Sequence, residues 1–396
     1  MKHILVETKK ELHGWYPGKR ECTAERMLIN PYNGCSVGCF YCYARALPGY
    51  FEIFHNEGTI FVSKDFDKTI AKQLDSIDVV TCGYLSPVTD PFQEIEKEYH
   101  LSEKIVRVFV ERNIPIEFIT KSVVPESVIE MIKSQKHSFG QVSILTDDED
   151  LRRVLAPGGA TCDQLFDNIS RLSKNNIFAV CRLDPIFPYI TDNKDSLKKI
   201  ISRAVDSGAK HIIASVLDIP AKISDWILQN IKKHFGTGIY YEYKRFYTEK
   251  IGYINANINY RKKIFDFLRN ECDRRNITFA LCMEYEIVGS GSNLSAPSKQ
   301  TADGKFIEHE KQIKGLNSEF MSSINCEGID IPVYIRKGEK FQPATDCLGN
   351  CLNCKDAKCG ISDLAMARSP DTKKDFKLKD YKKWSEEIKQ IRIPVV

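Results

Sequence analysis

The sequence lacks the features that mark several common classes of protein. It has no run of about 18 apolar residues, so no segment is expected to span a membrane. Its start, MKHILVETKKELHGWYPGKR, has no apolar stretch followed by a small-residue cleavage site, so we expect no signal peptide and a cytoplasmic protein. The net charge is only +4, which excludes a polycationic nucleic-acid wrapper but still allows a local basic groove.

The regular features of the chain predict an α/β fold. Apolar residues make up 42% of the 396 residues, an ordinary globular value. Short apolar runs alternate with amphipathic stretches, as in parallel strands joined by helices. These runs are Met27–Asn30, Val79–Leu85, Ile114–Thr120, Gln141–Leu145, Ile177–Leu183 and His211–Leu217. A partial (β/α)6 barrel is the simplest arrangement. A doubly wound sheet is the alternative, weakened because no Gly-rich phosphate loop follows a strand.

Four segments are expected along the chain. An N-terminal segment covers residues 1–25, and the barrel covers residues 26–238. Residues 239–288 form a flanking extension with a helix and a strand, and begin close to the aromatic and basic stretch YYEYKRFY. A linker rich in Gly and Ser opens the C-terminal region, residues 289–396, which carries several cysteines.

The chain contains 14 cysteines, and half of them lie in two short windows. A disulfide scaffold would be shorter and rich in cysteine throughout. Tight groups of thiols in a reducing compartment bind metal or carry out redox chemistry more often. The composition therefore favours a metalloprotein.

The first window is Cys35-x3-Cys39-x2-Cys42, directly after the first predicted strand. Three thiolates leave one iron of a 4Fe–4S cluster without a protein ligand. Gly34 and Gly38 allow the loop to curl around a cluster, and we expect Cys39 and Cys42 at the start of the next helix. The alternatives are three unrelated core cysteines, or half of a zinc site.

This window resembles the signature of the radical SAM superfamily, CxxxCxxC with an aromatic residue, here Tyr41, before the third cysteine. The resemblance implies that S-adenosylmethionine (SAM) chelates the open iron. It also implies that an electron from a low-potential donor, a ferredoxin or flavodoxin, cleaves SAM to a 5′-deoxyadenosyl radical. The cofactor then performs the difficult step and the protein positions it.

A closer resemblance is to the spore photoproduct lyase-like branch, also called DNA repair photolyase, over roughly residues 29–220. It rests on NPYNGC and CFYCYAR in the cluster loop, VTDPFQEIE at Val88–Glu96, FITKS at Phe118–Ser122, LAPGGA at Leu155–Ala160 and RLDPIFPYITD at Arg182–Asp192. The branch implies chemistry on a nucleic-acid base.

Candidate cofactor-binding residues lie at the ends of predicted strands, where a parallel barrel gathers its chemistry. Lys121 matches the branch lysine that holds the SAM carboxylate; the alternative is a solvated lysine at a strand end. Arg182 and Asp184 either face SAM or pair with each other as structural residues.

Three residues are candidates for hydrogen-atom transfer by resemblance to the lyases. Tyr41 and Tyr43 match the two relay tyrosines, although a packing role fits them equally well. Cys82 lies near the position of the hydrogen-donating cysteine, but the lyase cysteine directly precedes Thr-Ser-Asp, whereas Cys82 precedes Gly83. The alternative for Cys82 is a small hydrophobic residue in a buried strand.

The second window predicts a second metal site, either a 4Fe–4S cluster or zinc. Its four thiols are Cys347, Cys351, Cys354 and Cys359, and Cys326 or Cys282 could replace one of them. An auxiliary cluster would pass electrons or bind substrate.

We therefore expect a radical SAM enzyme that abstracts hydrogen from a substrate, with a nucleic-acid base as the leading candidate. YYEYKRFY offers aromatic stacking beside basic groups, although packing of its aromatic residues is the simpler use. The alternatives are modification of a peptide or small metabolite and, from another class, a non-catalytic iron–sulfur electron carrier.

Overall fold

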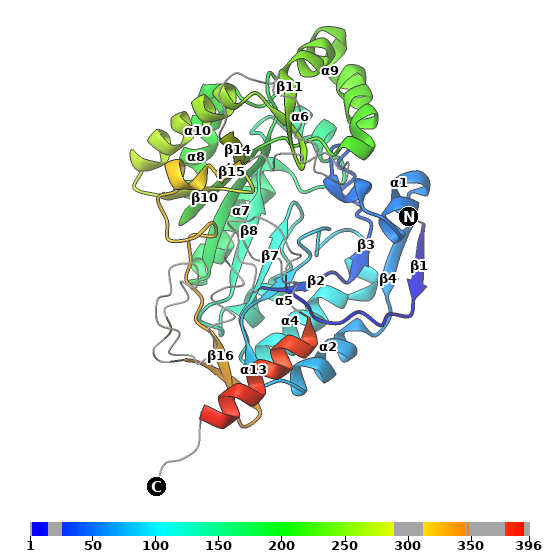
Figure 1. Cartoon of the computed structure of the whole chain (residues 1–396), viewed down its shortest axis with the longest axis vertical. Coiled ribbons are helices and arrows are strands. Elements are labelled where there is room, and N and C mark those ends of the chain that lie inside the picture. The colour runs from blue at the N-terminus through cyan, green and yellow to red at the C-terminus, as the bar shows by residue number, and fades with distance from the viewer. Residues whose placement is uncertain (1, 15–25, 289–311, 345–346, 348–376, 392–396) are drawn as a thin grey trace, which may run out of the picture.

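The computed structural model describes residues 2–14, 26–288, 312–344, 347 and 377–391. A sheet of seven parallel strands, in the order β13-β10-β9-β8-β7-β6-β2, forms its centre (Figure 1). The strands are β2 (Met27–Ile29), β6 (Gly83–Leu85), β7 (Ile116–Thr120), β8 (Phe139–Ser143), β9 (Phe178–Ile186), β10 (His211–Val216) and β13 (Thr278–Leu281). Each adjacent pair is parallel, so all C-terminal ends lie along one edge. The predicted partial barrel is confirmed, with β13 as a seventh strand.

One predicted strand, Val79–Leu85, is wrong because it divides into two. β5 (Val79–Val80) leaves the parallel sheet and pairs antiparallel with β16 (Tyr334–Lys337), next to β17 (Lys340–Pro343). β6 begins only at Gly83, where a Cβ atom would lie 2.6 Å from the Phe109 ring. Glycine at this position therefore permits the close packing of helix α4 (Leu101–Glu111) against the sheet.

Helices cover the outer face of the sheet. Their apolar residues recur at helical spacing, as in α7, where Leu165, Ile169 and Leu172 are buried. A capping box between Thr161 and Gln164 starts this helix. The helices along this face are α2 (Phe66–Asp75), α4 (Leu101–Glu111), α5 (Glu126–Ile132), α7 (Cys162–Lys174), α8 (Lys194–Asp206) and α10 (Ile258–Asp273).

The remaining elements lie outside the seven-stranded sheet. Helix α9 (Ser224–Phe246) is interrupted by a kink at Gly236, where φ is 90° and the backbone is not helical. The hairpin β11 (Tyr247–Ile251) and β12 (Tyr253–Ala256) follows it. The others are β1 (His3–Val6), β3 (Tyr32–Asn33), β4 (Ile60–Ser63), β14 (Tyr285–Val288), β15 (Gln312–Gly315), α1 (Tyr50–Glu57), α3 (Glu96–Tyr99), α6 (Glu149–Leu155), α11 (Asn317–Phe320), α13 (Leu378–Ile391) and the short 3-10 helices η1 (Tyr43–Ala46) and η2 (Ala221–Ile223).

In the described part of the chain, no helix has the length and apolar character needed to cross a membrane.

Candidate active site

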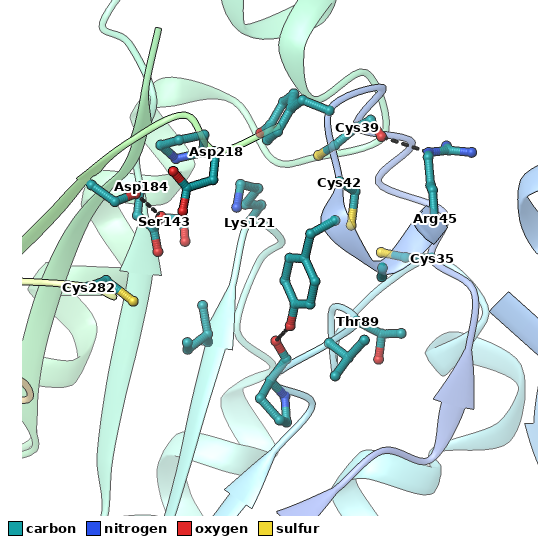
Figure 2. A pocket seen from close by; sticks show the side chains of 18 of the residues that line it. Cys35, Cys39, Cys42, Arg45, Thr89, Lys121, Ser143, Asp184, Asp218 and Cys282 are labelled. Atoms are coloured by element: carbon teal, nitrogen blue, oxygen red, sulfur yellow. Dashed lines mark hydrogen bonds between the residues drawn. The ribbon is translucent and has the colours of Figure 1, made fainter. Parts of the chain in front are cut away.

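A cavity of about 540 Å³ opens at the C-terminal edge of the parallel sheet. All seven strands, or the loops that follow them, contribute to its lining. Its size is typical of a site for a small molecule or cofactor. The strand-end residues predicted from the sequence therefore converge on one site, as Figure 2 shows.

The three cysteines of the first window line one side of this cavity (Figure 2). The backbone has positive φ values at Gly34 and Gly38, 103° and 77°, so the loop needs glycine at both positions to turn around the thiols. The expected helix at Cys39 is wrong. Only the short 3-10 helix η1 follows, with Cys42 at its N-cap. The loop alone therefore presents the thiols.

Two other stretches brace the cluster loop. The Gln93 side chain accepts a hydrogen bond from the Ser36 N–H at 2.8 Å and donates one to the Gly34 carbonyl at 3.2 Å. On the other side, the Gly158 N–H donates to the Val37 carbonyl at 2.9 Å. A Cβ atom at position 158 would lie 2.2 Å from the Ser36 carbonyl oxygen, so a glycine is required there. The VTDPFQEIE and LAPGGA stretches thus shape the loop.

The arrangement of the three thiols bears on which metal they could hold. Among the described residues, no three His, Cys, Asp or Glu side chains are arranged to bind one ion. Ligands of different irons in a cluster lie farther apart than ligands of one ion. Burial raises the pKa of Cys35 and Cys42, and Cys39 raises both further by its charge. Bound iron would relieve this penalty by stabilising the thiolates.

Lys121 extends into the cavity between the cysteines and Asp184 (Figure 2). Its backbone is fixed by Asp90, whose carboxylate accepts the Lys121 N–H at 2.6 Å and the Thr120 hydroxyl at 2.9 Å. Within the described residues its ammonium group forms no hydrogen bond or ion pair. It is therefore placed to bind an anionic group of a ligand.

Arg182 and Asp184 pair with each other on the wall of the cavity. The Arg182 guanidinium contacts the Asp184 carboxylate and donates to the Gln141 side-chain oxygen at 2.8 Å. The Asp184 carboxylate also accepts the Ser215 hydroxyl. Burial raises the pKa of Asp184, but Arg182 and Ser215 outweigh it and hold that pKa below its ordinary value. Both side chains line the cavity, so pairing and ligand contact are compatible.

A line of buried polar groups continues from Arg182 through the interior of the sheet. Gln141 donates to Glu117 at 2.8 Å, and Glu117 lies 3.2 Å from the Arg26 guanidinium. Arg26 in turn binds Glu327 at 2.7 Å. All of these side chains are almost completely buried, so each charge needs its neighbour. This network fixes the orientation of Arg182.

The hydrogen-transfer candidates lie in different surroundings. Tyr41 lines the cavity and packs edge-on against Phe187, with 4.8 Å between ring centroids. Tyr43 also lines the cavity, and its hydroxyl donates to the Pro87 carbonyl at 3.0 Å. Cys82 is fully buried in the core and is not part of the cavity lining. This position is the one expected if Cys82 acts as a small hydrophobic residue in a buried strand.

Of the second window, only Cys347 falls within the described residues. Its sulfur accepts the Val333 N–H at 3.5 Å. Cys351, Cys354 and Cys359 lie outside the described residues.

Three cavity residues were missed as site residues by the sequence reasoning. Cys282 directly follows β13, Asp218 follows β10 by two residues, and Tyr253 lies at the turn of the β11–β12 hairpin. The strand-end rule could have found Asp218, since the apolar run before it was recognised. Tyr253 carried no such signal because the hairpin stands outside the sheet.

Comparison with known proteins finds a matching family and several relatives. The sequence profile of the radical SAM superfamily matches residues 29–203. A protein of Pseudomonas phage M6, the "Radical SAM Nalpha-GlyT isomerase", is 26% identical over 395 residues, covering 94% of this chain and 78% of the phage protein. An uncharacterized protein of Mycobacterium tuberculosis is 23% identical over 217 residues, covering 51% of this chain and 62% of its own length.

Solved structures show the same fold. Spore photoproduct lyase complexed with dinucleoside spore photoproduct superposes with a TM-score of 0.52 at 13% identity, covering 70% of this chain and 81% of the lyase. A variant of that lyase with bound AdoMet and the same dinucleoside gives a TM-score of 0.53 at 12% identity, with the same coverage.

Proposed function

Because this chain is a radical SAM enzyme, we propose that it abstracts a hydrogen atom from a nucleic-acid base, using a 4Fe–4S cluster and SAM. The observation that carries the proposal is the convergence of three thiols, Lys121 and the Arg182–Asp184 pair on one cavity, with the Lys121 ammonium unpaired among the described residues. An electron carrier needs no such cavity. When bound and reduced, the two cofactors supply a 5′-deoxyadenosyl radical, the species that abstracts hydrogen.

The roles of the residues follow from their positions. Cys35, Cys39 and Cys42 would hold the cluster, and Lys121 would hold the carboxylate of SAM. Asp184, kept ionised by Arg182, is suited to accept hydrogen bonds from hydroxyl groups of a ligand. Tyr41, with its ring fixed by Phe187, helps to exclude water from the cavity.

The comparisons support a base as substrate and rearrangement as outcome. The phage relative is by its name an isomerase, and it is similar over almost the whole of this chain. The lyase structures share the fold and contain a dinucleoside. We therefore favour isomerisation over bond cleavage. A low-potential ferredoxin or flavodoxin would supply the electron.

The decisive experiment uses reduced, cluster-loaded protein with SAM. Release of 5′-deoxyadenosine, with deuterium transferred into it from a labelled base, supports the proposal. Parallel assays use oligonucleotides, tRNA, nucleosides and peptides. Deuterium transfer from peptides alone would replace nucleic acid with a peptide substrate, and no release with a full cluster would refute catalysis.

We also propose a second metal site at Cys347, Cys351, Cys354 and Cys359. If it is a second 4Fe–4S cluster, anaerobic reconstitution gives about 8 iron atoms per chain, and Cys351→Ala with Cys354→Ala reduces this to about 4. If the wild type and the double variant both bind about 4 iron atoms per chain, the second site holds zinc or no metal. Measurement of the zinc content then distinguishes these two cases.

A further inference from the structure

We propose that the carboxyl group of Asp218 binds a protonated amino group of the substrate. This inference rests on the proposed function and specifies its substrate class as an amine-bearing base. Asp218 lines the cavity just beyond the end of β10, with Asp184 and Lys121 nearby (Figure 2).

The Asp218 carboxyl group lacks any partner in the described part of the chain. Its Oδ1 atom is buried and makes no hydrogen bond. A buried carboxylate without hydrogen bonds or a counter-charge is unfavourable, so native proteins rarely retain one without a ligand. In contrast, the carboxylate of Asp90, equally close to the cavity, accepts three hydrogen bonds from protein groups.

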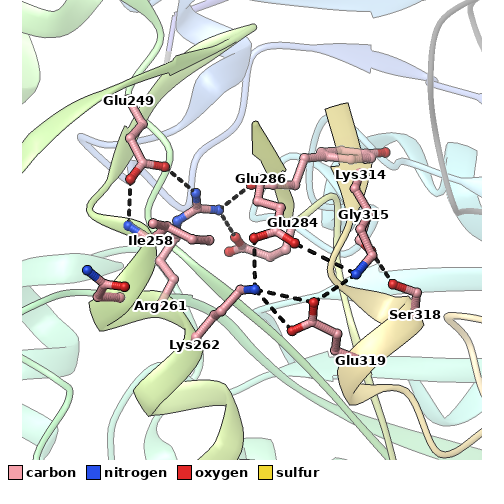
Figure 3. A network of polar contacts seen from close by, with 12 residues as sticks. Glu249, Ile258, Arg261, Lys262, Glu284, Glu286, Lys314, Gly315, Ser318 and Glu319 are labelled. Carbon is pink, nitrogen blue, oxygen red and sulfur yellow. Dashed lines mark hydrogen bonds and ion pairs between the residues drawn. The ribbon is translucent and has the colours of Figure 1, made fainter. Parts of the chain in front are cut away.

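Arg261, whose charge acts on Asp218, and Arg182 of the cavity wall already bind other carboxylates. Arg261 lies 2.8 Å from both Glu284 and Glu249 (Figure 3), and two more of its N–H groups donate to backbone carbonyls. Arg182 is paired with Asp184. Among the described residues, neither guanidinium forms a hydrogen bond or an ion pair with Asp218, and each is held by its own carboxylate partners.

The other cations of the cavity do not reach this carboxyl group either. Arg45 donates to the Cys39 carbonyl at 3.0 Å and lies over the Phe54 ring. Lys121 makes no ion pair with Asp218 within the described residues. In the described structure, Asp184 and the neighbouring Glu284 each form an ion pair with an arginine, whereas Asp218 of the cavity lining forms none.

The local field favours a cation over a neutral ligand at this point. Burial raises the pKa of Asp218 well above its ordinary value, and the charges of Glu284 and Asp184 raise it further, while Arg261 opposes them. A ligand ammonium at hydrogen-bond distance offsets both the burial and the repulsion. A neutral hydroxyl supplies a hydrogen bond but leaves the repulsion unchanged.

Tyr253 offers a surface on which a base could bind between Asp218 and the cluster loop. Tyr253, at the hairpin turn, lines the same cavity, and both Asp218 and Cys42 raise its pKa, after burial as the main cause. Tyr253 is therefore close enough to both Asp218 and Cys42 for their charges to act on it. A base bound against Tyr253 can place its amino substituent at Asp218 and its reacting carbon toward the cluster loop.

The test measures equilibrium binding rather than turnover. Full-length protein with its cluster and SAM is titrated by calorimetry with 5-aminomethyl-2′-deoxyuridine and, separately, with 5-hydroxymethyl-2′-deoxyuridine. We expect the amine to bind more tightly, and Asp218→Asn to weaken it by about tenfold to hundredfold, the usual range for a charged hydrogen bond. The affinity for the hydroxymethyl nucleoside should change by less than about twofold in Asp218→Asn.

Asp225→Asn is the matched control because Asp225 is exposed in the first turn of α9. It should leave both affinities unchanged, and SAM affinity in Asp218→Asn should equal that of the wild type. The inference would be overturned if the wild type binds the two nucleosides with equal affinity or does not bind the amine. It would also be overturned if Asp218→Asn binds the amine as tightly as the wild type. The proposed function is decided separately, by 5′-deoxyadenosine release, so either can fail alone.

Discussion

The guanidinium of Arg182 lies 3.1 Å from the sulfur of Cys282, a residue 100 positions later in the chain. This contact holds a thiol on the cavity wall, on the opposite side from the three clustered cysteines (Figure 2). It also ties β9 to the segment after β13. Cys282 is therefore a thiol of the site, whereas Cys82 is a thiol of the core.

Alkylation should distinguish these two thiols. Burial raises the pKa of Cys282 to about 11, despite the opposing charge of Arg182. Since only the thiolate reacts, the rate of iodoacetamide labelling at Cys282 should rise about tenfold per pH unit from pH 8 to pH 10. Cys82, fully buried, should stay unlabelled in the native protein. Mass spectrometry of tryptic peptides measures both, and a rate for Cys282 that levels off below pH 9 would contradict its raised pKa.

A methyl group at position 158 should disturb the cluster loop. In Gly158→Ala the new Cβ would lie 2.2 Å from the Ser36 carbonyl oxygen, so the loop must move. We expect less iron bound per chain and a loss of about 1–3 kcal/mol in the free energy of unfolding. Gly238→Ala is the control, since nothing lies within 4 Å of its Cβ. Normal iron content in Gly158→Ala would show that the loop tolerates the shift.

Removing the Lys121 ammonium should weaken SAM binding without loss of the cluster. Lys121→Met keeps the length of the side chain and removes its charge, so we expect SAM affinity to fall about tenfold or more at unchanged iron content. Lys136→Met, at an exposed position, should bind SAM normally. Calorimetric titration of cluster-loaded protein measures this, and an affinity within twofold of wild type would remove Lys121 from the SAM site.

Stability should depend on His211 between pH 7 and pH 5. The ring is buried against Thr278 and the Cys326 carbonyl, and burial lowers its pKa from 6.5 to about 4. The unfolded chain therefore binds more protons in this window, so stability is full above about pH 6.5 and is lost as the pH falls toward 4. The free energy of unfolding should fall by about 2 kcal/mol more in wild type than in His211→Gln between pH 7 and pH 5. Denaturant titrations at the two pH values measure it, and equal losses would refute the role.

The parallel sheet and the edge that carries the site could be predicted from the sequence. Continuous apolar runs identify strands buried on both faces, and the C-terminal ends of such strands must share an edge. For that reason Lys121, Arg182 and Asp184 were placed correctly in one cavity without any knowledge of distances.

The orientation of individual side chains could not be predicted. In a strand, a shift of one residue moves a side chain to the other face. The sequence therefore singled out Cys82, which is buried in the core, and missed Cys282, which lines the cavity. The bracing contacts of Gln93 and Gly158 join segments more than 50 positions apart. No local pattern indicates such pairings, although both residues lie in stretches that carried the family resemblance.

The loop around Gly158 touches both halves of the site. It bonds to Val37 in the cluster loop, and the Ala160 N–H donates to the Lys121 carbonyl at 2.8 Å. Ordering the cluster loop therefore also orders the backbone that carries Lys121. Such coupling is reciprocal, so occupancy by the cluster should raise affinity for SAM, and bound SAM should slow loss of the cluster to oxygen and chelators. The enzyme is thus expected to be most fragile during the interval between cluster insertion and the first binding of SAM.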